Sequence, residues 1–185
     1  MHKTFPVLGV ALGALGLLGG CSPSAPLPTV AHVDLERFMG DWYVIGNIPT
    51  FIERGAHNAV ESYALNPDGT IATTFRFRAG GFDGPLKQYH PTGYVQDDGS
   101  NAIWGMQFVW PIKAEYLIVF LDADYTQTVV ARNQRDYVWI MARTPTMPAA
   151  DYRRLVEQLG AWGYDTSAIQ RVPQRWNTTP TPGAR

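Results

Sequence analysis

Short segments in which apolar and polar residues alternate recur along most of the chain, at intervals of about 8 to 12 residues. In TIATTFRFR, residues 70–78, Ile71, Phe75 and Phe77 fall on one face of an extended strand, and Arg76 and Arg78 fall on the other. The pattern predicts strands at 42–48, 57–65, 70–78, 87–96, 102–109, 115–122, 127–132 and 137–143. It is typical of an all-β barrel or sandwich, and eight strands that close on themselves leave no exposed edge.

The period changes after the last of these segments. MPAADYRRLVEQLGAWG, residues 147–163, carries a helical apolar stripe made of Tyr152, Leu155, Val156, Leu159 and Trp162. A helix with one apolar face must pack on another surface. The outward residues of the eighth segment, Val138 and Ile140, are apolar, so we expect the helix outside the barrel. A short ninth strand is expected at 169–172.

The N-terminus has the pattern of a secretory signal, with Lys3 before an uncharged apolar run from Thr4 to Gly20. Leu18-Gly19-Gly20-Cys21 resembles the lipobox of bacterial lipoproteins, which implies that Cys21 carries lipid and that residues 1–20 are removed. Ser22 follows, not Asp, and by the same resemblance the outer membrane is expected, on its periplasmic side. The alternative is an ordinary cleaved signal followed by a free thiol. Residues 21–33 are expected to form a flexible tether, 34–172 the barrel, and 173–185 a disordered tail.

Charge and chemistry restrict the possible functions. Removal of the signal leaves 14 basic against 16 acidic residues, a net charge of −2, so nothing favours nucleic acid as a partner. His32, His57 and His90 do not have metal-ligand spacing, and no G-x-S-x-G motif is present. We therefore expect no enzyme activity, no cofactor and no metal.

Three spaced motifs carry a family resemblance. GDWYVIG at 40–46, LDADY at 121–125 and WIMARTP at 139–145 resemble, in order, the three lipocalin motifs. Together with the lipobox, they make the chain similar to the bacterial lipocalins, outer-membrane lipoproteins related to apolipoprotein D. The resemblance covers about residues 33–172. It implies an eight-stranded antiparallel up-and-down barrel with a C-terminal helix packed outside, and a calyx for a small hydrophobic ligand such as a fatty acid or lysophospholipid.

An up-and-down barrel brings the motifs to one closed end. Arg143 is expected to lie on the face of Trp42, a cation–π contact of about 0.5 to 2 kcal/mol. We interpret this set as structural and not catalytic: Gly40, Trp42, Asp124, Tyr125 and Arg143.

The opposite end should be an open mouth with an excess of basic residues. These are Arg54, Arg78, Lys87, Lys113, Arg132 and Arg135. They could draw an anionic head group toward the entrance. The alternative is that they are solvated loop charges without a role.

Strand period and resemblance to lipocalins together predict the residues that line the calyx. They are Glu61, Tyr63, Thr73, Phe75, Tyr89, Trp104, Met106, Phe108, Tyr116, Ile118, Phe120, Val129, Tyr137, Trp139 and Met141. Near the base such residues would simply form core.

Glu61 does not fit an apolar cup, because a buried carboxylate is costly unless it is paired, protonated or hydrated. The strand register could be off by one, Glu61 could pair with an inner Tyr or Arg, or it could recognise a ligand amine or hydroxyl. A packed interaction module without a ligand and a calyx enzyme using Glu61 are the alternative functions. The identity of the ligand and the oligomeric state, including a homodimer, stay open.

Overall fold

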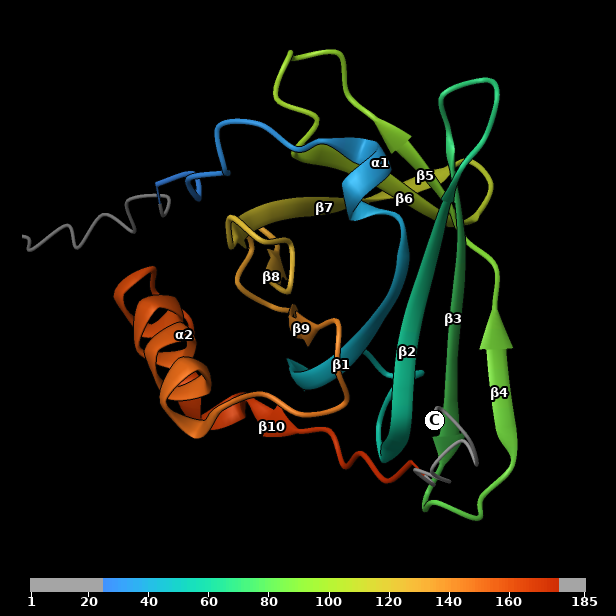
Figure 1. Ribbon diagram of the computed structural model, residues 1–185, viewed down its shortest axis with the longest axis vertical. Coiled ribbons are helices and arrows are strands. Elements are labelled where there is room, and N and C mark those ends of the chain that lie inside the picture. Colours follow the sequence, from blue (N-terminus) through green and yellow to red (C-terminus); the bar gives the residue numbers. More distant parts are fainter. Residues whose placement is uncertain (1–24, 177–185) are drawn as a thin grey trace, which may run out of the picture.

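The computed structural model describes residues 25–176 of the chain. Its strands are β1 (Gly40–Ile48), β2 (Ala56–Leu65), β3 (Ile71–Ala79), β4 (Leu86–Tyr89), β5 (Thr92–Val95), β6 (Ile103–Val109), β7 (Ile112–Leu121), β8 (Gln127–Ala131), β9 (Val138–Ala142) and β10 (Gln170–Arg171). The helices are α1 (Leu35–Phe38), α2 (Ala149–Ala161) and the 3-10 turn η1 (Thr166–Ala168). Figure 1 shows them as one curved sheet with α2 at its side.

The sheet closes into an antiparallel barrel. Neighbouring strands follow the order β1-β2-β3-β5-β6-β7-β8-β9, and β9 pairs with β1 to complete the ring. β4 and β5 both pair with β3, so together they occupy the position of the predicted fourth strand. The strand is interrupted at Pro91, which has no N–H to donate to a ladder. The predicted eight-stranded up-and-down barrel is therefore confirmed.

Two apolar clusters hold the fold together. The first fills the lower barrel and includes Trp42, Ile71 and Trp104. The second lies between the barrel wall and α2, where Leu155 and Leu159 are buried against the outward side chains of β8 and β9. Helix α2 therefore packs outside the barrel, as predicted.

Gly46 of β1 allows helix α2 to pack closely on the outer wall of the barrel. A Cβ at this position would lie 2.6 Å from the Tyr152 hydroxyl, so the side chain of Tyr152 occupies the space over the glycine. The predicted ninth strand is observed as the short β10, which pairs with β1 beside this point.

The segment before the barrel does not behave as a flexible tether over residues 25–33. Leu27 and Val33 are buried. The Val30 amide donates to the Ile118 carbonyl at 3.0 Å, and the Val33 amide donates to the Ser100 carbonyl at 2.8 Å. Apolar residues among the prolines give this segment a surface to bury, which the Pro/Ser composition does not reveal.

Residues 173–176, at the start of the predicted disordered tail, also make defined contacts with the barrel. The side-chain amide of Gln174 donates to the backbone carbonyls of Val44 and Ala59, and the Trp176 ring packs edge-on against Tyr43. Disorder is thus wrong for 173–176. The signal segment and Cys21 lie outside the described residues, as do residues 177–185.

None of the helices within residues 25–176 is both long and apolar enough to cross a membrane.

The closed end is built as the motifs predict. The Arg143 guanidinium lies 3.9 Å from the centre of the Trp42 ring and donates to the carbonyls of Asp41, Tyr125, Arg37 and Phe38. Gly40 has a φ of +94°, and a Cβ there would crowd the Arg143 guanidinium. Sequence-distant motifs therefore meet at one point.

Two features of this end differ from expectation. Asp124 is exposed and accepts no hydrogen bond from residues 25–176, whereas Asp122 accepts from the amides of Thr126 and Gln127 and shapes the turn. The carboxylate two residues earlier can reach these amides across the turn. In addition, α1 seals the base with the buried Phe38, whose ring packs on Trp42 and Trp104.

Candidate functional site

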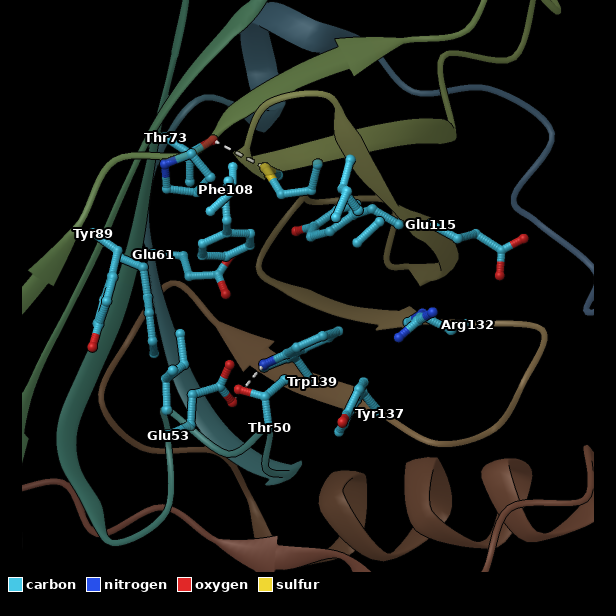
Figure 2. Close-up of a pocket in the computed structure, with 18 of the residues that line it drawn as sticks. Thr50, Glu53, Glu61, Thr73, Tyr89, Phe108, Glu115, Arg132, Tyr137 and Trp139 are labelled. Carbon is cyan, nitrogen blue, oxygen red and sulfur yellow. Dashed lines mark hydrogen bonds between the residues drawn. The ribbon is translucent and has the colours of Figure 1, made fainter.

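A cavity of about 470 Å³ occupies the half of the barrel next to the open end, beyond the plug of aromatic rings at the closed end. Figure 2 shows residues that line it. This volume is within the range of small-molecule sites. Its walls come from the loop after β1, from the strands β2, β3, β4, β6, β7 and β9 and from residues next to these strands, and most of the lining is apolar. Nine predicted residues line it: Glu61, Thr73, Phe75, Tyr89, Met106, Phe108, Tyr116, Tyr137 and Trp139.

Four predicted residues lie below the cavity in packed core. Trp104, Ile118 and Met141 are fully buried, and Tyr63 lies among them with its ring edge-on to Trp104. The closed end tapers onto the α1 plug, so side chains alone fill its interior.

Phe120 and Val129 were assigned to the interior wrongly. Both belong to the cluster under α2, on the outer face of the wall. The pairing register of β7 with β8 shifts between Ile118 and Phe120. Residues after this shift point to the opposite face from the one that strict alternation predicts. In β8 both faces are buried, so no alternation of polar residues shows which one faces inward.

Sequence reasoning missed the loop contribution to the cavity. Thr50, Phe51 and Ile52 close one side, and Val109, Ile112 and Ala114 at the β6–β7 hairpin close another. Alternation has no meaning in the loop after β1, and the other three residues lie at the strand ends next to the β6–β7 turn. Only the clustering of apolar residues there could have indicated them.

Glu61 is buried inside the cup, so the predicted register of β2 is correct at this position. It accepts a hydrogen bond from the Tyr63 hydroxyl, which itself lies 2.5 Å from the Tyr116 hydroxyl. Because Tyr63 has only one proton to give, Tyr116 donates to Tyr63 when Glu61 is ionised. Burial raises the pKa of Glu61 to about 7, the Tyr63 hydrogen bond opposes this rise, and the charge of Glu53 adds to it.

Glu53 is a second buried carboxyl group at the cavity wall. It accepts from the Trp139 indole N–H at 3.0 Å and from the Asn47 amide at 2.9 Å. Burial raises the pKa of Glu53, and these hydrogen bonds lower it in part. In the view of Figure 2, Glu53 and Glu61 lie on one side of the pocket and Arg132 on the other.

The predicted basic mouth has only one residue in the cavity wall, Arg132. Lys113 lies outside the barrel with its ammonium 3.4 Å from the centre of the Tyr94 ring. Arg135 donates to the carbonyls of Trp162, Asn133 and Ala25, which holds chain segments together. Side chains at loop ends can turn outward to such partners, and attraction of an anionic head group by the six cations stays a prediction.

The remaining three cations, Arg54, Arg78 and Lys87, are exposed and are absent from the cavity wall.

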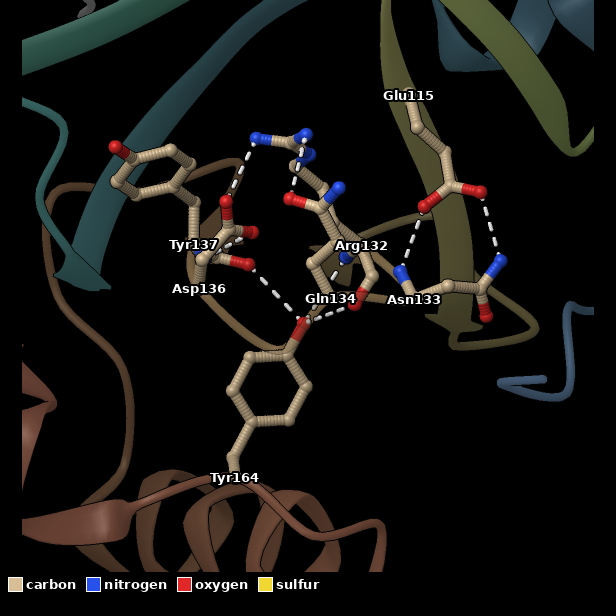
Figure 3. Close-up of polar contacts among 7 residues, drawn as sticks. All are labelled: Glu115, Arg132, Asn133, Gln134, Asp136, Tyr137 and Tyr164. Atoms are coloured by element: carbon tan, nitrogen blue, oxygen red, sulfur yellow. Dashed lines mark hydrogen bonds and ion pairs between the residues drawn. The ribbon is translucent and has the colours of Figure 1, made fainter. Parts of the chain in front are cut away.

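Arg132 lies in the loop between β8 and β9, and hydrogen bonds of the Tyr164 side chain hold this loop in place (Figure 3). The Tyr164 hydroxyl accepts from the Arg132 amide and lies 3.0 Å from the carbonyls of Arg132 and Tyr137. The Arg132 guanidinium pairs with Asp136 at 3.0 Å, while its Nε is buried and has no hydrogen-bond partner within residues 25–176. Arg132 therefore places a positive charge in the cavity wall, with its two terminal guanidinium nitrogens held by Asp136 and Gln134.

No group of three or more His, Cys, Asp or Glu residues within 25–176 is arranged to hold a metal ion.

A barrel plugged at one end and hollow and apolar at the other is a ligand-binding calyx. A family model described as a lipocalin-like domain matches residues 33–174, and the chain belongs to this family. Membership supports binding of a small hydrophobic ligand.

Individual relatives agree with this assignment and confirm the resemblance to bacterial lipocalins. Temperature-induced lipocalin-1 of Arabidopsis thaliana is 30% identical over 157 residues, covering 80% of this chain and 83% of that protein. Outer membrane lipoprotein Blc of Citrobacter freundii is 29% identical over 177 residues, covering 93% of this chain and 98% of that protein. Among solved structures, insecticyanin from the tobacco hornworm Manduca sexta superposes with a TM-score of 0.62 at 12% identity, covering 80% of this chain and 84% of that one. The last comparison shows the shared fold.

Proposed function

We propose that the protein is a lipid-anchored envelope lipocalin that binds a fatty acid or a lysophospholipid and stores or transports it. The observation that carries the proposal is the apolar cavity of about 470 Å³ above the sealed base. A chain of roughly fifteen methylenes buried there would gain about 12 kcal/mol before the costs of association. Micromolar to nanomolar affinity is the expected range.

The charges support binding with the tail down. An anionic head group placed deep in the cup would meet the buried carboxyl group of Glu61 without a compensating cation. At the entrance it would meet Arg132, the one Arg or Lys among the described residues that line the cavity. The head group is therefore proposed to lie at Arg132 and the acyl chain to run past Phe75 and Met106 toward the base.

The anchor is proposed from the lipobox at Cys21 and from the relatives. The Citrobacter relative is named an outer membrane lipoprotein, and it aligns over nearly the whole of both chains. Attachment through lipid at Cys21 on the periplasmic side of the outer membrane is the corresponding proposal for this chain. Several acyl chains on one residue would give stable attachment, whereas a single one gives marginal binding.

Lipid extraction from the purified protein tests the function directly. Mass spectrometry should detect a fatty acid or lysophospholipid in amounts comparable to the protein. An empty protein that also fails to bind added lipid would favour the packed interaction module. Chemical conversion of the added lipid would instead favour the calyx enzyme based on Glu61.

A charge variant tests the position of the head group. Arg132→Gln should weaken palmitate binding about five- to tenfold, because a charge-assisted hydrogen bond is lost. Binding of hexadecanol, which has the same chain and no charge, should change much less. Lys113→Gln is the matched control, since it removes a cation at the same end of the barrel but outside the cavity. Equal losses for both ligands would contradict the proposed head-group position.

A further inference from the structure

Exposed apolar side chains gather at the open end of the barrel. Within residues 25–176, six of the eight large apolar side chains that are exposed lie there: Phe51, Leu86, Phe108, Val109, Trp110 and Ile112. Trp110, at the tip of the β6–β7 hairpin, is 82% exposed, and Phe51 on the opposite loop is 79% exposed. We call these six residues the apolar rim. Clusters of this kind mark interaction surfaces, because water is a poor environment for them.

The N-terminal segment reaches the same end. Beside the closed end, Val33 bonds to Ser100, and from there the segment follows the wall past Ile118. The Leu27 amide then donates to the Asn133 side chain at 2.7 Å, and the Arg135 guanidinium donates to the Ala25 carbonyl at 2.6 Å. Asn133 and Arg135 belong to the mouth loop between β8 and β9. The described chain therefore begins at the level of the mouth.

The length of chain before this point limits where an anchor can be. Ala25 lies four positions after Cys21, and a fully extended chain spans at most about 14 Å over that length. A tether that was flexible through residue 33 would have allowed the barrel any orientation. With residues 25–33 held on the wall, lipid at Cys21 would keep the open end, and not the closed end, next to the membrane.

We propose that the open end docks on the surface of the lipid bilayer that holds the anchor, with Trp110, Phe51 and Ile112 inserted among the lipids. The proposal rests on the lipid anchor proposed above. Trp is favoured at the boundary between lipid head groups and acyl chains, where its apolar ring is buried and its N–H is hydrated.

The exposed mouth cations fit the same surface. Arg54, Arg78 and Lys87 form no ion pair within the described residues. They lie outside the cavity, so they face solvent beside the rim and not the ligand. Basic residues next to an anionic bilayer strengthen attachment at ordinary ionic strength. Docking in this orientation would let an acyl chain pass from the bilayer into the calyx without crossing bulk water.

The test uses the full chain, purified from membranes with its lipid attached and reconstituted into vesicles of phosphatidylethanolamine and phosphatidylglycerol. Once Cys21 is lipidated, Trp110→Cys introduces the only free thiol, which takes an environment-sensitive fluorophore. Leu65→Cys is the matched control, because Leu65 is also exposed but lies at the closed end. Replacing part of the lipid with brominated lipid then reports contact with acyl chains.

The expected result is blue-shifted emission and loss of intensity in brominated lipid at position 110, with neither change at position 65. Equal quenching at the two positions, or none at 110, would overturn the docking proposal. A second protein molecule seated on the rim would give the latter result and a dimer on crosslinking.

The result does not depend on ligand binding. A protein that docks but binds no lipid in its cavity would therefore refute the proposed function and leave the docking surface standing.

A charge variant sharpens the test without changing any residue of the apolar rim. Arg54→Glu, Arg78→Glu and Lys87→Glu combined should reduce the quenching at position 110 in vesicles with phosphatidylglycerol. In vesicles of phosphatidylcholine alone the reduction should be much smaller. Unchanged quenching in the anionic vesicles would contradict the role given to these cations.

Discussion

The two ends of the barrel use the same kinds of residue in opposite ways. At the closed end, Trp42 is fully buried, and the Arg143 guanidinium over it donates to several carbonyls. At the open end, Trp110 is exposed, and the Arg132 Nε has no partner within the described residues. Indole and guanidinium groups that are buried and paired internally stabilise the fold, whereas an exposed indole such as that of Trp110 is available to other molecules.

Carboxyl groups show the same contrast. Asp41, near the base, is partly buried, which tends to raise its pKa, but hydrogen bonds from Ser62 and Arg76 outweigh this and its pKa is lowered. Glu61, in the cavity, has only a tyrosine hydroxyl as partner, and its pKa is raised. Burial of the Glu61 carboxyl group in the cup therefore carries an electrostatic cost, which the Asp41 carboxylate near the base avoids through its hydrogen bonds. Such a cost is expected at sites that serve function and not stability.

The largest expected effect separates the two tryptophans. Trp42→Ala should lower the free energy of unfolding by about 3 to 5 kcal/mol, because it empties a large buried volume at the plug. Trp110→Ala should change it by less than about 0.5 kcal/mol, since the ring is exposed. Urea denaturation of both variants measures the difference. Similar losses in the two variants would mean that the rim is part of the folded core.

The next prediction concerns pH and Glu61. The folded protein holds this proton up to about pH 7, whereas the unfolded chain releases it near 4.5, so the group stabilises the fold at low pH. That contribution is lost as pH rises through about 7. Glu61→Gln should therefore be more stable than wild type at about pH 8, by on the order of 3 kcal/mol.

Denaturation at acidic and alkaline pH measures this effect, with Glu36→Gln on the exposed face of α1 as the control. A wild-type protein as stable at alkaline as at acidic pH, with no gain in Glu61→Gln, would show that the carboxyl group carries no cost.

A smaller loss is expected at the plug when only the geometry of the cation changes. Arg143→Lys keeps the charge but loses the planar stacking on Trp42 and most of the carbonyl contacts. It should cost about 1 to 3 kcal/mol in thermal or urea unfolding. Arg153→Lys on the exposed face of α2 should be neutral, and an equal loss there would refute the role of the plug.

The smallest expected change in free energy concerns the cup. Thr73→Phe would place a ring in the cavity and should weaken palmitate binding by about tenfold or more, while the fold persists. Thr74→Phe, the next residue on the outer face of β3, is the matched control for titration with the same ligand. Loss of affinity in both variants would point to the strand as a whole and not to the cavity.

Much of the fold was determined by the sequence itself. Alternation of polar and apolar residues located the strands, because one face of each strand is buried and the other hydrated. The three motifs identified the plug, because an up-and-down topology forces Trp42 and Arg143 to one end. The inward position of Glu61 followed from the same period.

Only the tertiary structure decided the rest. The facing of Phe120 and Val129 depends on an irregularity in β7 and on α2, which buries the outer wall and removes the polar alternation. The direction of Lys113 and Arg135 depends on partners far away in sequence. The path of residues 25–33 depends on apolar contacts with a wall that exists only after the barrel has closed. The local sequence pattern shows which residues are buried away from water. It does not show whether such a residue packs inside the barrel or between the barrel wall and α2.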